Sequence, residues 1–149
     1  MDVRVVEVTR ASVRAVCRLD AGDDGRQVAP NAVSIAEAHF CPQAWFRAIE
    51  ADTELAGFLM LYDPTLGTDP EESNFTLWRL MVDARFQNRG IGARAIEQLI
   101  EHLRSRPGAR QLHLSHVKSN DAVARLYRRL GFRYTGVEDE GELVMVRDL

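Results

Sequence analysis

Cysteine is scarce in this chain, and metal-binding motifs and long hydrophobic runs are missing. Only Cys17 and Cys41 are present, without a CxxC pair, which argues against a disulfide framework and indicates a reducing compartment. No apolar run approaches the length of a membrane span, and the first residues lack the apolar core of a signal peptide, so we expect a cytoplasmic protein. No HExxH motif or Cys/His cluster occurs, and His113 and His116 fall on opposite faces of one predicted strand. We therefore predict no metal site.

Charge and composition narrow the class of protein further. The formal net charge of −3 argues against a nucleic-acid binder, and this mild acidity permits a cationic substrate. With 149 residues, 46% of them hydrophobic and 28% charged, we expect one soluble globular domain spanning 1–149. No repeat, low-complexity tract or linker interrupts it.

Hydrophobic periodicity predicts the order strand, two helices, three strands, helix, strand, helix and two strands. This order indicates a mixed α/β sheet covered by helices. Asp52-Thr53 marks a hairpin turn, Asn120 a helix start and Gly131 a helix end. The predicted strands are 3–8, 45–51, 55–62, 75–82, 112–117, 132–137 and 142–146. The predicted helices are 12–19, one from Asn31 or Ser34 to Pro42, 91–103, and one after Asn120; 20–25 and 63–74 are predicted loops.

The stretch Gln87-Asn88-Arg89-Gly90-Ile91-Gly92 lies between a predicted strand and a predicted helix. Its two glycines let the backbone come close to a bulky anion without Cβ clashes. The free N–H groups of the first helical turn point at such an anion, and the helix dipole favours it. Arg89 and Arg94 add positive charge. This pattern predicts a binding site for a pyrophosphate.

Three features together resemble the GCN5-related N-acetyltransferase (GNAT) family: this turn, Asn120, and the string Leu126-Tyr127-Arg128-Arg129-Leu130-Gly131-Phe132. The family's phosphate turn reads Q/R-x-x-G-x-G/A, and its late helix ends in a tyrosine followed by Gly-Phe. The resemblance implies a mixed, mostly antiparallel sheet flanked by helices, with two strands splayed apart at the acetyl-CoA site.

The resemblance also implies which residues hold the coenzyme. The pantetheine arm would pair with strand backbone, the pyrophosphate would lie over the turn, and Asn120 would bind the arm or simply cap its helix. Arg125 and Arg129 would meet phosphates or be solvated surface. The implied coenzyme-binding residues are Met81, Val82, Gln87, Asn88, Arg89, Gly90, Ile91, Gly92, Ala93, Asn120, Arg125, Tyr127 and Arg129.

Acetyl transfer to an amine needs a proton donor for the departing thiolate and a base for the amine. Tyr127 is the candidate acid, since a phenol with a reference pKa of about 10 can protonate a thiolate. On helix spacing alone it could also be a core tyrosine on the apolar face of its helix.

The general base stays open. Many family members carry a glutamate in the strand before the turn, where this chain has Trp78 and Arg79. Candidates are Glu37, Glu72, His116 or a chain of ordered waters. Glu37 could be an ordinary exposed helix residue, and a lone strand histidine such as His116 is more often structural.

A narrower resemblance is to bacterial diamine and polyamine (spermine/spermidine) acetyltransferases. It rests on Leu77–Asp83, on Val28-Ala29-Pro30-Asn31, and on Gly136 with Gly141–Val144. It implies an acceptor channel lined by carboxylates and aromatic rings. The available side chains, each of which could also be ordinary surface or core, are Glu37, Asp63, Glu71, Glu72, Trp45 and Trp78.

The sequence therefore predicts an acetyl-CoA-dependent N-acetyltransferase acting on a small primary amine, with a diamine or polyamine favoured. Neither cysteine lies near the predicted site, which favours direct transfer. Alternatives are another acceptor (an aminoglycoside, an amino acid or a protein N-terminus), a coenzyme-binding sensor, or a dinucleotide oxidoreductase. A dinucleotide oxidoreductase has its glycine turn after an early strand, whereas the turn of this chain lies past mid-chain. Dimers are common among such enzymes.

Overall fold

The computed structural model of the chain describes residues 1–22 and 29–149, so Val28 and residues 23–25 of the predicted loop 20–25 lie outside the described residues. The elements follow the predicted order. The strands are β1 (Val3–Val6), β2 (Ala44–Ala51), β3 (Glu54–Tyr62), β4 (Phe75–Val82), β5 (Gln111–Val117), β6 (Arg133–Asp139) and β7 (Glu142–Asp148). The helices are α1 (Val13–Arg18), α2 (Asn31–His39), α3 (Ile91–Arg104) and α4 (Asp121–Arg129), with a short 3₁₀ helix, η1 (Ala84–Phe86), before α3.

Local signals place several of these boundaries correctly. Helix α3 begins at Ile91 as predicted, and α2 begins at Asn31, the earlier of its two predicted starts. The hairpin turn at Asp52-Thr53 has φ of +49° and +71°, the backbone of the tight turn that suits twisted antiparallel strands. Gly131, with φ of +89°, follows α4 as its predicted terminating glycine. Strand β1 is shorter than predicted and ends at Val6.

The strands form a seven-stranded sheet in the order β1-β2-β3-β4-β5-β7-β6. Every neighbouring pair is antiparallel except β4 and β5, which are parallel. The predicted mixed, mostly antiparallel sheet is therefore confirmed.

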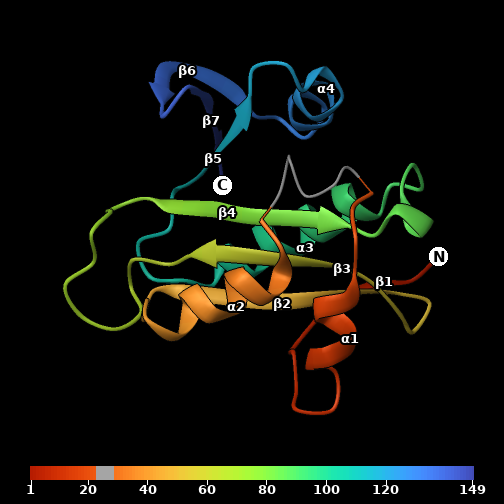
Figure 1. Cartoon of the computed structure of the whole chain (residues 1–149). Coiled ribbons are helices and arrows are strands. Elements are labelled where there is room, and N and C mark those ends of the chain that lie inside the picture. The colour runs from red at the N-terminus through yellow and green to blue at the C-terminus, as the bar shows by residue number, and fades with distance from the viewer. Residues whose placement is uncertain (23–28) are drawn as a thin grey trace.

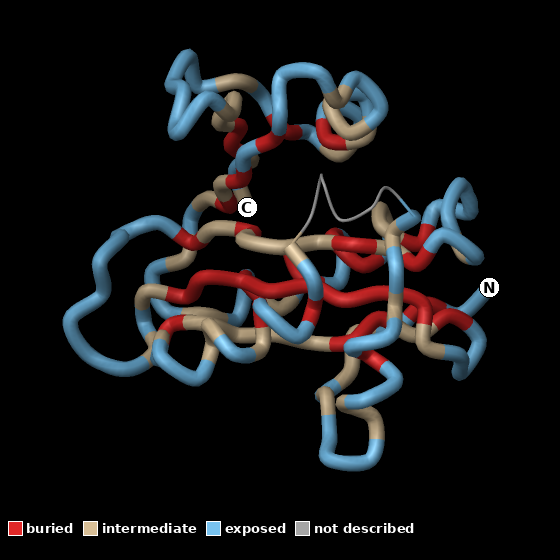
Figure 2. Tube along the Cα trace, viewed as in Figure 1, coloured by how far each residue is buried: buried red, intermediate tan, exposed pale blue. Residues whose placement is uncertain are grey.

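Helices cover the sheet on both faces (Figure 1). Helices α1 and α2 lie on one face, where Val16 packs with Phe58, Met60 and Met81. Helix α3 covers the other face, and its apolar side recurs at the three- and four-residue spacing of an amphipathic helix. Strand β3 lies between the two layers and is buried along most of its length (Figure 2).

Strands β4 and β5 pair at their first residues and then separate. Their ladder joins Phe75 to Leu112 and Thr76 to His113. Beyond these pairs β4 continues beside β3 as far as Val82, whereas β5 continues beside β7 as far as Val117. Figure 1 shows the two strands running apart. The splayed strands that the resemblance implies are present, and we call the space between them the wedge.

A β-bulge interrupts β4 next to the wedge. Leu61 of β3 faces Leu77, but its neighbour Met60 faces Arg79, so Trp78 is the extra residue. The bulge breaks the alternation of side chains between the two faces. As a result Trp78 packs on the α1/α2 side and Arg79 reaches α2 on the same side.

A buried ion pair anchors the loop that connects β3 to β4. Asp63 is 1% exposed, and its carboxylate accepts hydrogen bonds from Arg106 Nε at 2.9 Å and from Thr65 Oγ1 at 2.6 Å. Arg106 follows α3, so the pair joins segments far apart in sequence. This placement corrects the suggestion that Asp63 lines an acceptor channel, because its side chain is buried and fully engaged.

We expect Asp63→Ala to lower the free energy of unfolding by about 3 kcal/mol, because it leaves the partly buried Arg106 without its counter-charge. Denaturant titration measures the change. The matched control is Glu101→Ala, which breaks the exposed Arg104–Glu101 pair and should cost less than about 0.5 kcal/mol. Equal losses in the two variants would contradict the anchoring role.

Candidate active site

The glycine turn presents an uncapped helix N-terminus. Gly90 is the N-cap of α3, with a left-handed backbone at φ +77°, and no side chain of the described residues caps the helix there. Asn88 is also left-handed, with φ +63°. The first N–H groups of the helix, those of Ile91, Gly92 and Ala93, have no carbonyl one turn earlier to bind. This arrangement can accept an anion.

The space around both glycines fits such a ligand. A Cβ added to Gly90 would meet nothing within 4 Å, and one added to Gly92 would only touch the Val82 side chain at 3.7 Å. The protein's own packing therefore does not require a glycine at 92, where it costs about 1 kcal/mol relative to alanine within a helix. A glycine at this position leaves room for a bulky anion to come close to the backbone, as the sequence pattern predicts.

The Gln87 side chain, just after η1, holds this turn against the segment after α1. Gln87 Nε2 donates to the carbonyl oxygens of Ala21 at 2.8 Å and of Val82 at 2.9 Å. The turn motif identified Gln87, but its side chain is a tether between two backbone segments. Nothing in the motif indicates this tether, because Ala21 is distant in sequence.

Asp83 is a second tether, which sequence reasoning missed. Its carboxylate accepts from the Asp20 N–H at 3.0 Å and from Arg85 Nε at 2.8 Å. Burial alone would raise the pKa of Asp83, but the hydrogen bonds from Arg85 and from the Asp20 and Arg85 N–H groups outweigh it and hold the pKa below its ordinary value. The carboxylate is therefore ionised at neutral pH.

Several arginines lie around the turn and on α4. Arg89 is exposed, with its guanidinium 5.6 Å from the Phe86 ring centroid, and Arg94 donates to the Met1 carbonyl. Arg125 and Arg129 are exposed and one helical turn apart on α4, so they share a face. These positions suit phosphate binding, although Arg94 is already engaged with the N-terminal residue.

The backbone N–H and C=O groups of successive β4 residues point alternately toward β3 and toward the wedge. Met81 is in register with Phe58 of β3, and a Cβ on Gly57 would collide with its carbonyl, so that carbonyl faces β3. Alternation then turns the N–H and C=O groups of Leu80 and Val82 toward the wedge. Gln87 takes one lone pair of the Val82 carbonyl.

Tyr127 and Asn120 come from the other side of the wedge. Asn120 caps α4, since its Oδ1 accepts from the Val123 N–H at 3.2 Å. Tyr127 lies on the buried side of α4, 8% exposed, with its ring centroid 5.7 Å from that of Phe132. Burial raises the pKa of Tyr127 to about 12, so its hydroxyl keeps its proton at neutral pH.

His116 is buried next to Tyr127, with both ring nitrogens engaged. Nδ1 lies 2.8 Å from the Val117 carbonyl oxygen, and Nε2 lies 2.9 Å from the Tyr134 hydroxyl. Because a carbonyl can only accept, Nδ1 carries a proton and donates to Val117, and Nε2 shares a hydrogen bond with the Tyr134 hydroxyl. This is the bonding of a structural histidine. To act as a base, His116 would have to give up its bond to Tyr134.

The other predicted bases differ in surroundings. Glu37 of α2 accepts from Arg79 Nη2 at 3.0 Å, so it faces β4 and is not an isolated surface residue. Glu71 and Glu72 are exposed in the loop before β4, at the opposite end of that strand from the glycine turn. The structure brings Glu37, Trp78 and Arg79 together and leaves the two loop glutamates apart.

Trp45 belongs to a different face of the sheet. Its ring stacks on His102 of α3, with centroids 4.3 Å apart. On the other ring face lies the guanidinium of Arg47, 4.1 Å from the centroid. Trp45 therefore packs on the α3 side, opposite Glu37 and Trp78, and does not line an acceptor channel with them.

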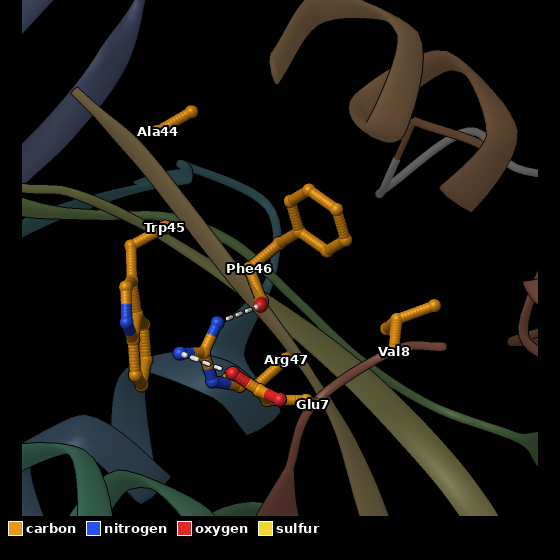
Figure 3. Close-up of a pocket in the computed structure, with 6 residues that line it drawn as sticks. All are labelled: Glu7, Val8, Ala44, Trp45, Phe46 and Arg47. Carbon is orange, nitrogen blue, oxygen red and sulfur yellow. Dashed lines mark hydrogen bonds and ion pairs between the residues drawn. The ribbon is translucent and has the colours of Figure 1, made fainter. Parts of the chain in front are cut away.

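A pocket of about 260 Å³ opens beside Arg47, at the edge of β2 that β1 leaves uncovered (Figure 3). There Arg47 donates to the Phe46 carbonyl at 2.8 Å and lies 3.8 Å from Glu7, so its side chain covers the free strand edge. Strand β3 separates this pocket from β4. The pocket therefore lies away from the wedge and the glycine turn. Its lining residues are Glu7, Val8, Ala44, Trp45, Phe46 and Arg47.

Across residues 1–22 and 29–149, no group of three or more His, Cys, Asp or Glu side chains could hold a metal ion. In the same residues, no helix is both long enough and apolar enough to cross a membrane.

The chain belongs to the acetyltransferase (GNAT) family, whose model matches residues 16–132. It is 35% identical over 99 residues to a spermine/spermidine N(1)-acetyltransferase of Bacillus subtilis (strain 168), an alignment covering 64% of each chain. The chain thus matches a little under two thirds of that relative's length. Among solved structures, the fold resembles AAC(6')-Ib in complex with paromomycin and acetyl-CoA, with TM-score 0.79, 17% identity and coverage of 99% and 94%. It also resembles PaiA N-acetyltransferase from Thermoplasma acidophilum in complex with coenzyme A, with TM-score 0.74, 13% identity and full coverage of both chains.

Proposed function

We propose that this protein is an acetyl-CoA-dependent N-acetyltransferase that transfers acetyl directly to a primary amine of a diamine or polyamine, such as spermidine or spermine. The observation that carries the proposal is the wedge between β4 and β5, which has an uncapped, glycine-led helix N-terminus at the end of β4. Family membership and the name of the Bacillus subtilis relative support the acceptor class.

In this proposal the chain binds the donor with backbone groups. The N–H groups of Ile91, Gly92 and Ala93 hold the pyrophosphate, and Leu80 and Val82, rather than Met81, pair with the pantetheine arm. Asn120 contributes from the far side of the wedge. Each hydrogen bond to a charged group contributes about 1.5–3 kcal/mol, so the backbone cradle outweighs a helix-dipole effect of about 1 kcal/mol. The side chains of Arg89, Arg125 and Arg129 add positive charge that attracts the coenzyme's phosphates, and added salt weakens this attraction.

Acetyl-CoA supplies a thioester: a C–N bond forms to the amine, the C–S bond breaks, the amine loses a proton and the departing sulfur gains one. Tyr127 donates a hydrogen bond to that sulfur. With a pKa of about 12 it stays protonated throughout the neutral range. Neither cysteine lies on β4, β5 or α4, the elements that border the wedge: Cys17 is on α1 and Cys41 follows α2. Direct transfer is therefore the proposed course.

Screening a panel of amines for release of the coenzyme A thiol tests the proposal. We expect release with spermidine, spermine or putrescine, and acetylated amine in equal amount by mass spectrometry. Release only with aminoglycosides, amino acids or peptides would contradict the acceptor class while keeping the reaction. Binding of acetyl-CoA without thiol release from any amine would indicate a sensor domain and reject the enzyme.

A further inference from the structure

We propose that the ion pair between Glu37 and Arg79 determines acceptor specificity: the second ammonium of a diamine replaces the Arg79 guanidinium on the Glu37 carboxylate. The inference rests on the proposed function, because it concerns the acceptor side of the same site.

The location of the pair supports this role. Arg79 lies in β4 beyond Thr76, the last residue that pairs with β5, and so in the part of the strand that borders the wedge. The bulge at Trp78 turns Trp78 and Arg79 toward the same side, where Glu37 of α2 meets Arg79 at 3.0 Å. An acceptor that approaches the wedge from the α1/α2 face meets these side chains.

The exposure of the two partners is unequal. The Glu37 side chain is 40% exposed and that of Arg79 only 19%. The Arg79 guanidinium also lies 5.2 Å from the Trp78 ring centroid, so the indole offers a cation a π face at this point. The carboxylate is thus the more accessible partner, and a cation from solvent can reach it.

The chemistry of the pair makes Arg79 a competitor of the substrate. A carboxylate accepts hydrogen bonds from an ammonium as readily as from a guanidinium, and a diamine carries one ammonium besides the reacting amine. While the Arg79 guanidinium is bound to the Glu37 carboxylate, the incoming ammonium must displace it. The ammonium then stays close to the displaced guanidinium, and the two positive charges repel each other. A monoamine has no such group and gains nothing from Glu37. Glu37 therefore favours acceptors with a second cation, and Arg79 weakens their binding by competing for the Glu37 carboxylate.

The test compares KM for putrescine and for n-butylamine, which has the same carbon chain and a single amine. We expect Arg79→Gln to lower the putrescine KM about three- to tenfold, and Glu37→Gln to raise it about tenfold. In the double variant, Arg79→Gln should have no further effect because the carboxylate is gone. The n-butylamine KM should stay within about twofold throughout. A purely structural role would change both amines alike. The matched control is the exposed Arg104–Glu101 pair, whose variants should change neither KM.

Calorimetric titration of spermidine into the coenzyme A-saturated protein separates the two proposals. Acetylation of spermidine with the same KM in all variants would overturn the specificity pair and leave the function intact. Spermidine binding that depends on Glu37, without acetyl transfer, would overturn the function and leave the pair. A higher putrescine KM in Arg79→Gln would assign Arg79 to the substrate itself and overturn the competition.

Discussion

Tyr127→Phe should reduce kcat by about 10²- to 10³-fold while acetyl-CoA binding is retained. The hydroxyl is the group that donates to the departing sulfur in the proposed reaction, and removal of one such donor typically costs this much. Phenylalanine fills the same buried space beside Phe132, so the variant should fold. Thiol release under saturating substrates measures kcat, and calorimetry measures coenzyme binding.

The pKa of Tyr127 decides how the hydroxyl acts. A pKa of about 12 lies roughly 3.5 units above the reference value of a thiol, so complete proton transfer to the thiolate is uphill by about 5 kcal/mol. Donating a hydrogen bond carries no such cost. With the ordinary pKa of a tyrosine, as expected from the sequence, Tyr127 would be a stronger acid than its burial allows.

Tyr62→Phe is the matched control, because Tyr62 is also buried and its hydroxyl accepts from the Glu72 N–H at 3.2 Å, away from the glycine turn. Its turnover should match wild type.

The raised pKa of Tyr127 also predicts an alkaline loss of stability: between pH 10 and about 12 the unfolded chain loses this proton and the folded chain keeps it. Wild type should lose about 2–3 kcal/mol there relative to Tyr127→Phe. Unchanged turnover in Tyr127→Phe would remove the hydroxyl from the mechanism.

Gly90→Val should weaken acetyl-CoA binding by about ten- to a hundredfold. A branched side chain at this position would extend into the open space beside the helix N-terminus and block the pyrophosphate from one or more N–H groups. The φ of +77° adds a cost that sequence alone did not show, since valine is strained by about 1–2 kcal/mol in a left-handed backbone. Calorimetry with acetyl-CoA measures the affinity, and denaturant titration measures the strain.

Gly108→Val isolates the strain. Gly108 has φ +72° and, like Gly90, would place a Cβ within 4 Å of nothing. It lies past the opposite end of α3, which is about 20 Å long. Both variants should lose similar stability, and only Gly90→Val should lose affinity. Equal affinities in the two variants would mean that the glycine turn does not bind the coenzyme.

Local sequence patterns predicted the order of the elements and the positions of several helix ends and turns. The glycine turn, Asn120 as a cap and Gly131 as a helix end are fixed by residues a few positions apart, where backbone conformation and hydrogen bonding follow directly from residue type. Tyr127 was identified by its place in a short helix motif.

Contacts between distant segments could not be predicted in this way. The bulge at Trp78 depends on the register of β3 against β4, and it decides that Arg79 reaches Glu37. The bond from Gln87 to Ala21 and the pair of Asp63 with Arg106 join segments that only the fold brings together. Strand periodicity placed His116 on one face but gave no sign that Tyr134 would engage its Nε2.

The most direct test of the coenzyme site is amide NMR of the wild-type protein during titration with acetyl-CoA. We predict saturable shifts centred on the N–H groups of Ile91, Gly92 and Ala93, joined by Leu80, Val82 and Asn120 on the two sides of the wedge. The amides around Glu7 and Arg47 should stay unchanged. Shifts centred on that second pocket, or none at saturating acetyl-CoA, would contradict the account.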